Sequence, residues 1–351
     1  MATTGPDKAP FSDLSAGPNP LRRFFDKPPA RVTLRIADLD LENGPYCTSF
    51  GRPLKPLASS MQRVGLLNPP LVHRGQGEAW DVVCGFQRLR ALLEMGEETC
   101  PCLELSTPHP GPVELLLMGV YDNLTTRGLN EVEKGRVLER LAAYLDETTV
   151  LRDGMALLGL PSRASVLSSY RALVGAEAMV QQAVASGLLS MKAFCLLKRW
   201  PSPDRTEACD WVTNLRMNFN KQYQFVELLD DISIEEQITP QGLLQLDSIR
   251  SVLAQEGVNR PQKTVRVLET LRKRRFPKLE AAERAFRKQV SSLELPKGVR
   301  VVHPPGFEGS DFRLEVVFRN GSDLRKRLET LFQTQGLKAL NAPRGNEGEG
   351  A

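Results

Sequence analysis

A glycine followed closely by arginines lies where an expected strand meets an expected helix. Gly85 ends the apolar run Trp80–Cys84, and Arg88 and Arg90 fall in the first turns of the segment that follows. Backbone N–H groups at the start of a helix and neighbouring guanidinium groups both stabilise a bound phosphate. The spacing therefore predicts a phosphate-binding turn, although many strand–Gly–helix junctions bind nothing.

The residues before Gly85 would position this turn. Residues 71–72 and 80–84 are short apolar runs typical of strands, and a Gly-Gln-Gly sequence between them indicates a hairpin. Upstream, apolar residues between positions 54 and 65 recur at helical spacing. The expected order is therefore helix, strand, hairpin, strand and then the glycine. Further along the chain, Asn130 with Glu133 three positions later has the spacing of a capping box, so a helix is expected to start there.

A second candidate site follows a short turn further along the chain. Residues 151–158 and 162–174 are expected helices, joined by a tight Gly-Leu-Pro turn. This is the helix-turn-helix pattern, whose second helix enters the DNA major groove, although an ordinary helical hairpin has the same pattern. Ser162 is the expected N-cap, and Arg and Ser side chains reach base edges and phosphates. The candidate DNA contacts are Ser162, Arg163, Ser165, Ser168, Ser169 and Arg171.

Composition limits the classes of protein that the chain can be. At 351 residues, with 41% hydrophobic residues, two or three packed domains are expected. The sequence has no apolar run of about 18 residues and no apolar segment near its start, so neither a membrane span nor a secretory signal is expected. Six irregularly spaced cysteines and three histidines give no metal-ligand pattern. We expect a reduced, cytoplasmic protein without a membrane partner.

Positive charge is concentrated in one segment. The net charge is +4, but the stretch from Arg260 to Lys288 holds eleven Lys and Arg against three Glu, a local charge of +8 that leaves the rest near −4. Such a stretch is often a solvated helix end, since basic side chains suit a helix C-terminus. Its length favours a phosphate-binding face instead. The candidate DNA contacts in its densest run are Arg272, Lys273, Arg274 and Arg275.

The sequence predicts an α+β protein made of several parts. The expected layout is a disordered tail at 1–30, a small mixed domain at 31–130, an all-helical domain at 131–256, a basic helical segment at 257–292, a small β-β-α unit at 293–335 and a disordered tail at 336–351. Within the first tail, residues 21–25 (LRRFF) are either a partner-docking motif or an incidental apolar stretch. The β-β-α unit is too small to fold alone, so it is expected to dock on the preceding helices or on a second subunit. Ser322 is the expected cap of its helix.

Four ordered segments resemble motifs of the partition protein B family, the ParB/Spo0J-like proteins. Residues 57–69 resemble the family's I-x-S-I-x-x-x-G-L-L-x-P motif, and residues 85–91 resemble its G-E-R-R-x-R-A box. Residues 122–130 resemble its E-N-L-Q-R-x-x-L-N motif. Residues 159–173, with a Gly-Leu-Leu-Ser sequence at 187–190, resemble its helix-turn-helix and the continuation of that motif.

The resemblance implies a nucleotide pocket and assigns residues to it. In the family this pocket holds cytidine triphosphate (CTP), and Gly85, Gln87 and Arg88 would face its phosphates. Asp122 and Asn123 would hold Mg²⁺ together with phosphate oxygens, since oxygen ligands suit this hard cation. No residue is assigned as catalytic, and the expected activity is at most that of a weak CTPase.

The resemblance covers roughly residues 31–200 and also implies partners and a cellular role. It implies a ParB/sulfiredoxin-type N-terminal domain and a helix-turn-helix domain that binds a specific site in double-stranded DNA. A homodimer and a ParA-type ATPase partner are implied as well. The expected role is chromosome or plasmid partition by a cytoplasmic, nucleoid-associated protein.

The chain departs from the family's motifs at several nucleotide-facing positions. Phe86 and Gln87 stand where the box has Glu and Arg, and Thr125 and Thr126 stand where the third motif has Gln and Arg. Arg127 is displaced from the expected arginine by one position. About half of the family's phosphate contacts are therefore changed, and the CTP and Mg²⁺ switch is expected to be incomplete.

Two other functions remain open from the sequence. A transcriptional or phage/plasmid regulator could keep the helix-turn-helix and lack the nucleotide switch. A sulfiredoxin-like ATP-dependent enzyme would need a nucleophilic cysteine directly after the glycine of the turn, where this chain has Phe86. Cys84 lies before Gly85 instead, in strand register, and is expected to be buried and inert, which makes the enzyme the less favoured alternative.

Overall fold

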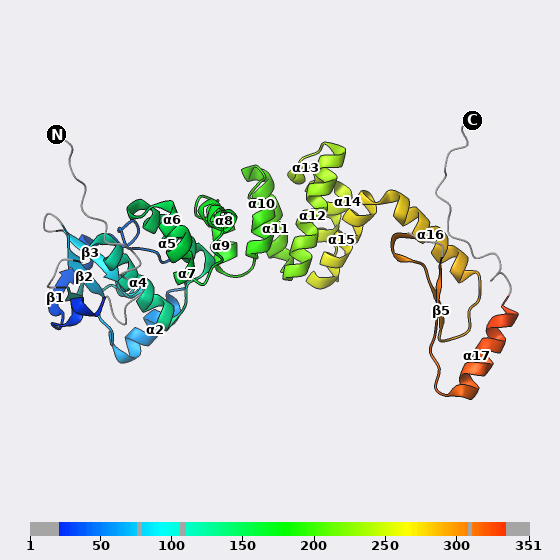
Figure 1. Ribbon diagram of the computed structural model, residues 1–351, viewed down its shortest axis with the longest axis horizontal. Coiled ribbons are helices and arrows are strands. Elements are labelled where there is room, and N and C mark those ends of the chain that lie inside the picture. The colour runs from blue at the N-terminus through cyan, green and yellow to red at the C-terminus, as the bar shows by residue number, and fades with distance from the viewer. Residues whose placement is uncertain (1–20, 76–78, 106–109, 308–310, 335–351) are drawn as a thin grey trace. The chain divides into compact units, whose positions relative to one another are not determined.

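The structure is a computed structural model that describes residues 21–75, 79–105, 110–307 and 311–334. The chain divides into two compact units, unit 1 at residues 1–226 and unit 2 at residues 227–351, and each is described by itself (Figure 1). The predicted tails at 1–20 and 336–351 lie outside the described residues. Residues 21–30 were predicted to belong to the first tail, but this is wrong, because they form a short helix and the start of the first strand.

The first part of unit 1 is a sheet with helices on both faces. Its elements are η1 (Arg22–Phe25), β1 (Ala30–Arg35), η2 (Ile36–Asp38), α2 (Lys55–Val64), β2 (Leu71–Arg74), β3 (Trp80–Cys84), α3 (Phe86–Glu94), β4 (Thr99–Glu104) and α4 (Pro112–Thr126). The strands lie in the order β1, β4, β2, β3; the central pair is parallel and the two outer pairs are antiparallel. The predicted order of helix, two strands and a glycine that opens a helix is confirmed.

Each face of the sheet is buried in a separate core. Val82 and Val83 are neighbours on β3, and because successive side chains of a strand point to opposite faces, they enter different cores. The core around Val82 includes Met61 of α2 and Leu89 of α3. The core around Val83 includes Leu116 of α4. Burial on both faces explains why β3 has consecutive apolar residues rather than an alternating pattern.

The rest of unit 1 is helical and continues the core around Val83. Its elements are α5 (Glu131–Tyr144), α6 (Glu147–Thr149), the π-helical turn η3 (Val150–Gly154), α7 (Met155–Leu157), α8 (Ala164–Val174), α9 (Ala178–Ala185), α10 (Met191–Leu197) and α11 (Ser202–Leu215), and α12 (Phe219–Glu236) spans the division between the units. Leu138 of α5 and Tyr170 of α8 lie in the same buried cluster as α4. The helices on the two sides of the predicted boundary at 130/131 therefore share one buried core.

Two helix starts were predicted in unit 1, with different outcomes. Asn130 caps α5 as expected: its side chain accepts a hydrogen bond from the Glu133 N–H at 2.9 Å, and the Glu133 carboxylate accepts one from the Asn130 N–H at 3.0 Å. Ser162 does not cap α8, because the chain stays extended for one residue longer. The N-cap is Arg163, with φ −129° and ψ 133° and no side-chain capping bond.

Unit 2 continues with helices and ends in a small β-β-α unit. Its elements after α12 are α13 (Pro240–Leu244), α14 (Asp247–Ala254), α15 (Arg260–Arg275), α16 (Pro277–Ser291), β5 (Val299–Val302), η4 (Pro305–Phe307), β6 (Arg313–Val316) and α17 (Gly321–Gln333). β5 and β6 pair antiparallel. The β-β-α unit docks on α16, where the Phe286 ring lies 5.6 Å from that of Phe312. Asn320 caps α17 in place of the predicted Ser322. No helix in the described part of the chain is long and apolar enough to cross a membrane.

Candidate functional site

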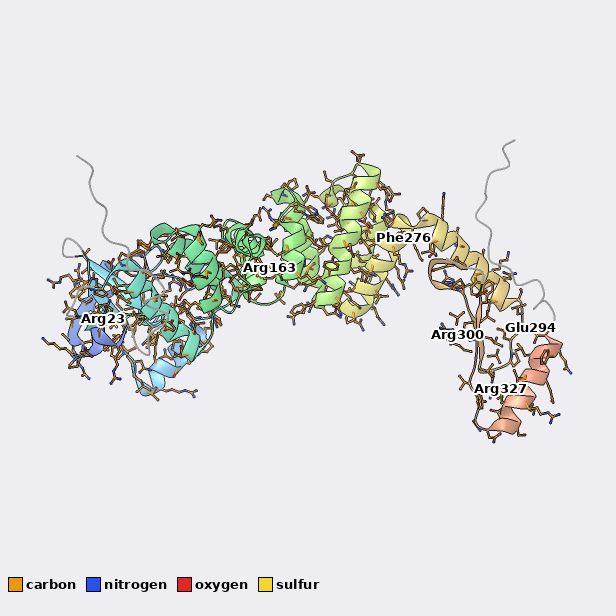
Figure 2. The ribbon with its side chains drawn as sticks, viewed as in Figure 1. Arg23, Arg163, Phe276, Glu294, Arg300 and Arg327 are labelled. Carbon is orange, nitrogen blue, oxygen red and sulfur yellow. The ribbon has the colours of Figure 1, made fainter. Side chains whose placement is uncertain are left out.

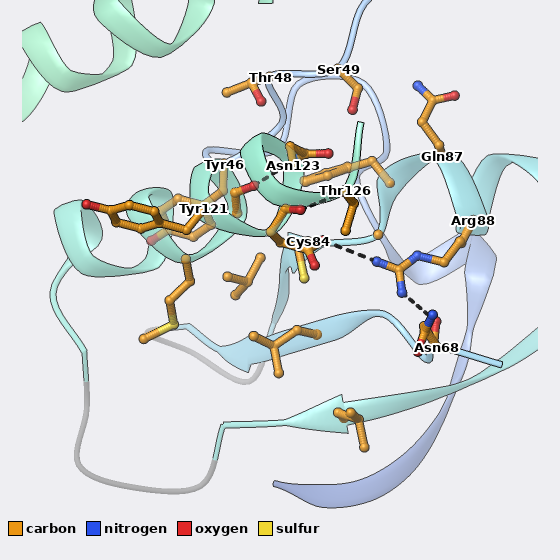
Figure 3. Close-up of a pocket in the computed structure, with 18 of the residues that line it drawn as sticks. Tyr46, Thr48, Ser49, Asn68, Cys84, Gln87, Arg88, Tyr121, Asn123 and Thr126 are labelled. Carbon is orange, nitrogen blue, oxygen red and sulfur yellow. Dashed lines mark hydrogen bonds and ion pairs between the residues drawn. The ribbon is translucent and has the colours of Figure 1, made fainter. Parts of the chain in front are cut away.

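A cavity of about 1040 Å³ opens in unit 1 at the end of β3 (Figure 3). Its walls come from η1, the start of α3, the C-terminal half of α4, and the segment between η2 and α2. The residues predicted to contact nucleotide or metal all line it: Gly85, Gln87, Arg88, Asp122 and Asn123. The fold thus brings the second and third sequence motifs, about 35 positions apart, to one cavity.

Gly85 makes the turn from β3 into α3, and its position requires glycine. Its φ is +98°, and a Cβ there would lie 2.9 Å from two atoms of Pro70. The first N–H groups of a helix have no intrahelical acceptors, and the helix dipole adds positive potential at the same end. The start of α3 therefore presents donors suited to a phosphate at the cavity wall.

Arg88 is held at the cavity wall by two groups. Its guanidinium donates to the carbonyl oxygen of Asn68 at 2.5 Å and lies 3.5 Å from the carboxylate of Asp122. Its side chain is only 20% exposed, so a cation is positioned before any ligand enters. Gln87 makes no side-chain hydrogen bond within the described residues, which leaves its amide available to a ligand.

Asp122 and Asn123 lie in the last turns of α4, which packs closely on β3. A Cβ on Gly119 would lie 2.7 Å from the carbonyl oxygen of Val83, so glycine permits this approach. The Asn123 amide donates to the Gly119 carbonyl at 2.6 Å and accepts a hydrogen bond from Arg127 at 2.8 Å. Both hydrogen bonds hold Asn123 in a fixed orientation at the wall of the cavity.

The two residues predicted to hold Mg²⁺ suit an ion that arrives with phosphates. The Asp122 carboxylate is near Arg88, and the Asn123 oxygen already accepts from Arg127. Among the residues that the structure describes, no group of three or more His, Cys, Asp or Glu side chains could hold a metal ion. Mg²⁺ usually keeps several waters and takes phosphate oxygens alongside one or two carboxylates. The cavity fits that mode and does not provide a site made of protein ligands alone.

A buried carboxylate beside the cavity was not predicted as part of the site. The Glu133 side chain is 0% exposed and accepts hydrogen bonds of 2.9 Å from both Arg52 and Arg127. Burial alone would raise the pKa of Glu133, but the hydrogen bonds from the two arginines hold that pKa below its ordinary value. Arg127 also lines the cavity, so the displaced arginine of the third motif reaches the site. The capping pattern at Glu133 was the sequence signal that marked this position.

The loop at residues 44–53 forms another wall of the cavity. It is held in place by hydrogen bonds from arginine side chains to its backbone carbonyl groups. Arg136 donates to the carbonyl oxygen of Ser49 at 3.0 Å, and Arg140 donates to carbonyl oxygens earlier in the loop at 2.6 to 3.0 Å. Thr48 and Ser49 of this loop line the cavity. The helix α5 thus fixes the loop against the cavity through guanidinium groups.

Cys84 lines the cavity but is not an activated thiol. Burial, reinforced by the nearby carboxylate of Asp122, raises the pKa of the Cys84 thiol to about 11. The thiolate is the nucleophilic form, and a raised pKa makes it scarce at neutral pH. The residue after Gly85 is Phe86, which is 4% exposed and belongs to the core. This environment speaks against sulfiredoxin-like chemistry.

Most of the predicted DNA contacts on α8 are exposed, and one is not. The exposed ones are Ser162, Arg163, Ser165, Ser168 and Arg171. Ser169 is 5% exposed: its hydroxyl donates to a backbone carbonyl one turn earlier and accepts a hydrogen bond from Lys198, both at 2.8 Å. The prediction for Ser169 is therefore wrong, because this side chain is buried and its hydroxyl makes both hydrogen bonds within the protein.

The two arginines of α8 differ in how available they are. Arg163 stands at the start of the helix (Figure 2), and its side chain makes no ion pair or hydrogen bond within the described residues. Arg171 lies 3.3 Å from the carboxylate of Glu147. Arg163 is thus the cation on this helix that a ligand can use without first breaking a contact.

The basic run at the end of α15 lies among carboxylates. The pairs are Arg272 with Glu283 at 3.6 Å, Lys273 with Glu280 at 3.9 Å, Arg274 with Glu236 at 2.6 Å, and Arg275 with Glu235 and Asp231 at 3.0 and 3.3 Å. These acidic residues come from α12 and α16 and offset much of the positive charge. The run therefore offers phosphates less charge than its composition indicated.

Comparison with known proteins gives relatives that match part of the chain. No family model matches. The chain is 30% identical over 112 residues to the probable chromosome-partitioning protein ParB of Vibrio cholerae, covering 30% of this chain and 37% of that protein. It is 36% identical over 88 residues to the chromosome-partitioning protein Spo0J of Thermus thermophilus, covering 25% and 31%. It is 30% identical over 140 residues to the stage 0 sporulation protein J of Bacillus subtilis, covering 39% and 46%. The chain thus spans less than half the length of each of these relatives.

Two solved structures of one protein are also similar. One is the C-terminally truncated chromosome-partitioning protein ParB of Caulobacter crescentus complexed to the centromeric parS site, with 18% identity and a TM-score of 0.31 over 56% of this chain and 98% of that one. The same protein complexed with CTP-gamma-S has 20% identity and a TM-score of 0.24 over 52% and 98%. The resemblance to ParB/Spo0J-like proteins that the motifs indicated is confirmed by the sequence relatives.

Proposed function

We propose that this ParB-like chain binds a specific site in double-stranded DNA and acts in chromosome or plasmid partition. Sequence relatives named for chromosome partitioning support the role. The exposed side of α8 supports the contact, because Arg163 at its N-cap and the serines on and just before its first two turns have access to solvent. A recognition helix reads base edges mainly through the side chains near its N-terminus. The resemblance further favours a cytoplasmic, nucleoid-associated homodimer and a ParA-type ATPase partner.

The cavity beside Gly85 is proposed to bind CTP with Mg²⁺. The observation that carries this is the convergence on one cavity of five residues from two distant motifs. The start of α3 and the guanidinium of Arg88 favour the phosphates. Arg127 provides a second guanidinium at the wall, in place of the arginine that the third motif lacks at position 126. Asp122 would bind Mg²⁺ through its carboxylate, with phosphate oxygens completing the shell.

The nucleotide switch is proposed to be weaker than the family motifs imply. Phe86 is part of the core and offers no polar group to a ligand. The hydroxyl groups of Thr125 and Thr126 donate to carbonyl oxygens of α4, at 3.0 and 2.6 Å for the shortest bonds. The family motif has Gln and Arg at these two positions. The threonine hydroxyls that stand there in this chain already make hydrogen bonds within α4, so they have less to offer a phosphate. CTP hydrolysis is accordingly expected to be weak or absent.

The proposed function is tested by selecting bound sequences from random DNA, with and without CTP and Mg²⁺. One enriched sequence whose binding changes with CTP is the expected result. Calorimetry with CTP, GTP and ATP would measure nucleotide binding directly, with Arg88→Gln expected to weaken it and the exposed Arg35→Gln serving as the control. Absence of binding to any nucleotide at millimolar concentration would exclude the switch.

A DNA-binding regulator without a nucleotide switch is the second candidate. The satisfied hydroxyl group of Thr126 favours it, since this side chain lines the cavity but donates to a carbonyl oxygen of α4. This regulator would select one DNA sequence equally well with and without CTP. A sulfiredoxin-like enzyme would require Cys84 to react with a thiol reagent in the native protein faster than an ordinary cysteine, and the raised pKa of this thiol predicts slow labelling.

A further inference from the structure

The short helix η1 lies outside the segments that resemble known motifs, yet it forms part of the cavity wall. Leu21, Arg22 and Phe25 all line the cavity. η1 is a 3₁₀-helix, with three residues per turn, so side chains three positions apart eclipse one another. Arg22 and Phe25 therefore share the face of η1 that borders the cavity.

The other residues of η1 anchor it to the core and to α4. The Phe24 side chain is 4% exposed and packs in the core around Val83. Arg23 (Figure 2) lies 2.5 Å from the carboxylate of Glu114 and 4.8 Å from the centre of the Phe24 ring. Residues 21–25 are therefore attached to the fold through Phe24 and Arg23.

The two residues on the cavity face are available to a ligand. The Arg22 side chain makes no ion pair or hydrogen bond within the described residues, and Phe25 is 42% exposed. A guanidinium offers five N–H donors, and an aromatic ring offers a stacking surface. Within the described residues, the fold thus holds against the cavity one cation that makes no side-chain hydrogen bond or ion pair and one ring that is partly exposed.

The cavity has two chemically different ends. Gln87 and Arg88 lie on one side of it, and Tyr46 and Tyr121 lie on the other (Figure 3). η1 is attached at Glu114, near the start of α4, roughly 12 Å along the helix axis from Asp122 at 1.5 Å per residue. The anchoring point places η1 toward the N-terminal half of α4, whereas Asp122 and Asn123 lie near the C-terminal end of that helix.

We propose that η1 forms the base-binding end of the nucleotide cavity, with Phe25 stacking on the nucleobase and Arg22 donating to its polar edge. This inference rests on the proposed binding of a nucleoside triphosphate. With the phosphates at the start of α3, the base extends toward the end of the cavity that has aromatic side chains. A pyrimidine base carries a carbonyl and a ring nitrogen that accept hydrogen bonds, which matches the guanidinium of Arg22.

The test measures the affinity of the full chain for CTP and for inorganic tripolyphosphate, each with Mg²⁺, by calorimetry. Phe25→Ala is expected to weaken CTP binding roughly tenfold, the usual scale of one stacking contact, and to leave tripolyphosphate binding unchanged. Phe25→Tyr keeps the ring and is expected to retain CTP affinity. Phe219→Ala, at an exposed phenylalanine that does not line the cavity, is the matched control.

The outcomes separate this inference from the proposed function. If wild type binds CTP and Phe25→Ala binds it equally well, the role of η1 is overturned and the nucleotide site stands. An equal loss of CTP and tripolyphosphate affinity in Phe25→Ala would also overturn it, since the effect would not involve the base. If wild type binds no nucleotide, both proposals fail. Arg22→Gln is expected to weaken CTP binding severalfold, with Arg35→Gln as its control.

Discussion

Two arginine clusters, one in each unit, have similar composition and different surroundings. In unit 1, Arg52 and Arg127 share the carboxylate of Glu133, which is 0% exposed. In unit 2, Arg274 pairs with Glu236, which is 32% exposed. Water and salt screen the second pair far more than the first. The number of arginines in a segment therefore says little about how strongly they stabilise the fold or how much charge they offer to DNA.

The largest expected effect is on folding stability when the buried carboxylate loses its charge. Glu133→Gln is expected to lower the free energy of unfolding by about 3 kcal/mol, because it leaves two guanidinium groups without a buried counter-charge. Glutamine can still accept the capping hydrogen bond at the start of α5, so the change isolates the charge. Glu236→Gln is the matched variant and is expected to cost less than about 1 kcal/mol. Urea denaturation measures both, and equal losses would contradict the comparison.

The same carboxylate predicts how stability depends on acid. The pKa of Glu133 is lowered in the folded state, so its contribution is fully present above the unfolded-state pKa of about 4.3 and is lost as pH falls through the folded-state pKa. The wild-type protein is therefore expected to lose stability over this acid range, and Glu133→Gln is expected to lose less. Denaturation curves at several pH values measure the difference. Parallel pH profiles for the two proteins would show that Glu133 does not contribute.

The comparison of paired and unpaired arginines also applies to DNA affinity, where Arg163 has no side-chain partner within the described residues and Arg171 has one. Arg163→Ala is expected to cost about 1–3 kcal/mol of binding free energy at the selected sequence if the side chain reads a base. Arg171→Ala is expected to cost less, because that side chain already has Glu147 as a partner. Affinity measured on the selected site and on unrelated DNA separates the two roles. Equal weakening on all DNA would make Arg163 a phosphate contact.

The smallest expected effect on DNA comes from the basic run of α15. Replacing its four cations with glutamine is expected to weaken binding without changing sequence preference, and to flatten the salt dependence. The change in slope is expected to be smaller than that of about four phosphate contacts, because nearby carboxylates offset the charge. Binding measured from low to high salt gives the slope. An unchanged slope would make the run an ordinary solvated helix end.

Local structure near the cavity was predictable where one short signal determined it. The apolar run before Gly85 predicted β3 with its correct ends, and Asn130 with Glu133 predicted the start of α5. The helix α4 was harder to predict, because residues 113–118 form a short apolar run that suits a buried strand or a buried helix equally. Whether such a run forms a helix or a strand is decided by the part of the fold on which it packs, which the run itself does not indicate.

The site was predictable in its motifs and not in its long-range contacts. Gly85 and Asp122 could be assigned to one pocket because the segments around them match two motifs of a known family in the same order. Arg52 and Glu133 are 81 positions apart, and no local pattern marks a contact at that separation. Ser169 is buried, and its hydroxyl accepts a hydrogen bond from Lys198, which is 29 positions away at the end of α10. Pairing and burial of this kind arise from tertiary packing, which periodicity and spacing along the chain do not record.

The way in which α5 holds the loop at residues 44–53 has an evolutionary consequence. Arg136 and Arg140 bind peptide carbonyl groups of the loop, and every amino acid provides the same carbonyl. Mutations that replace Thr48 or Ser49 would therefore alter the lining of the cavity while leaving the anchors intact. Selection can then change which ligand the cavity accepts without first rebuilding the attachment of its wall.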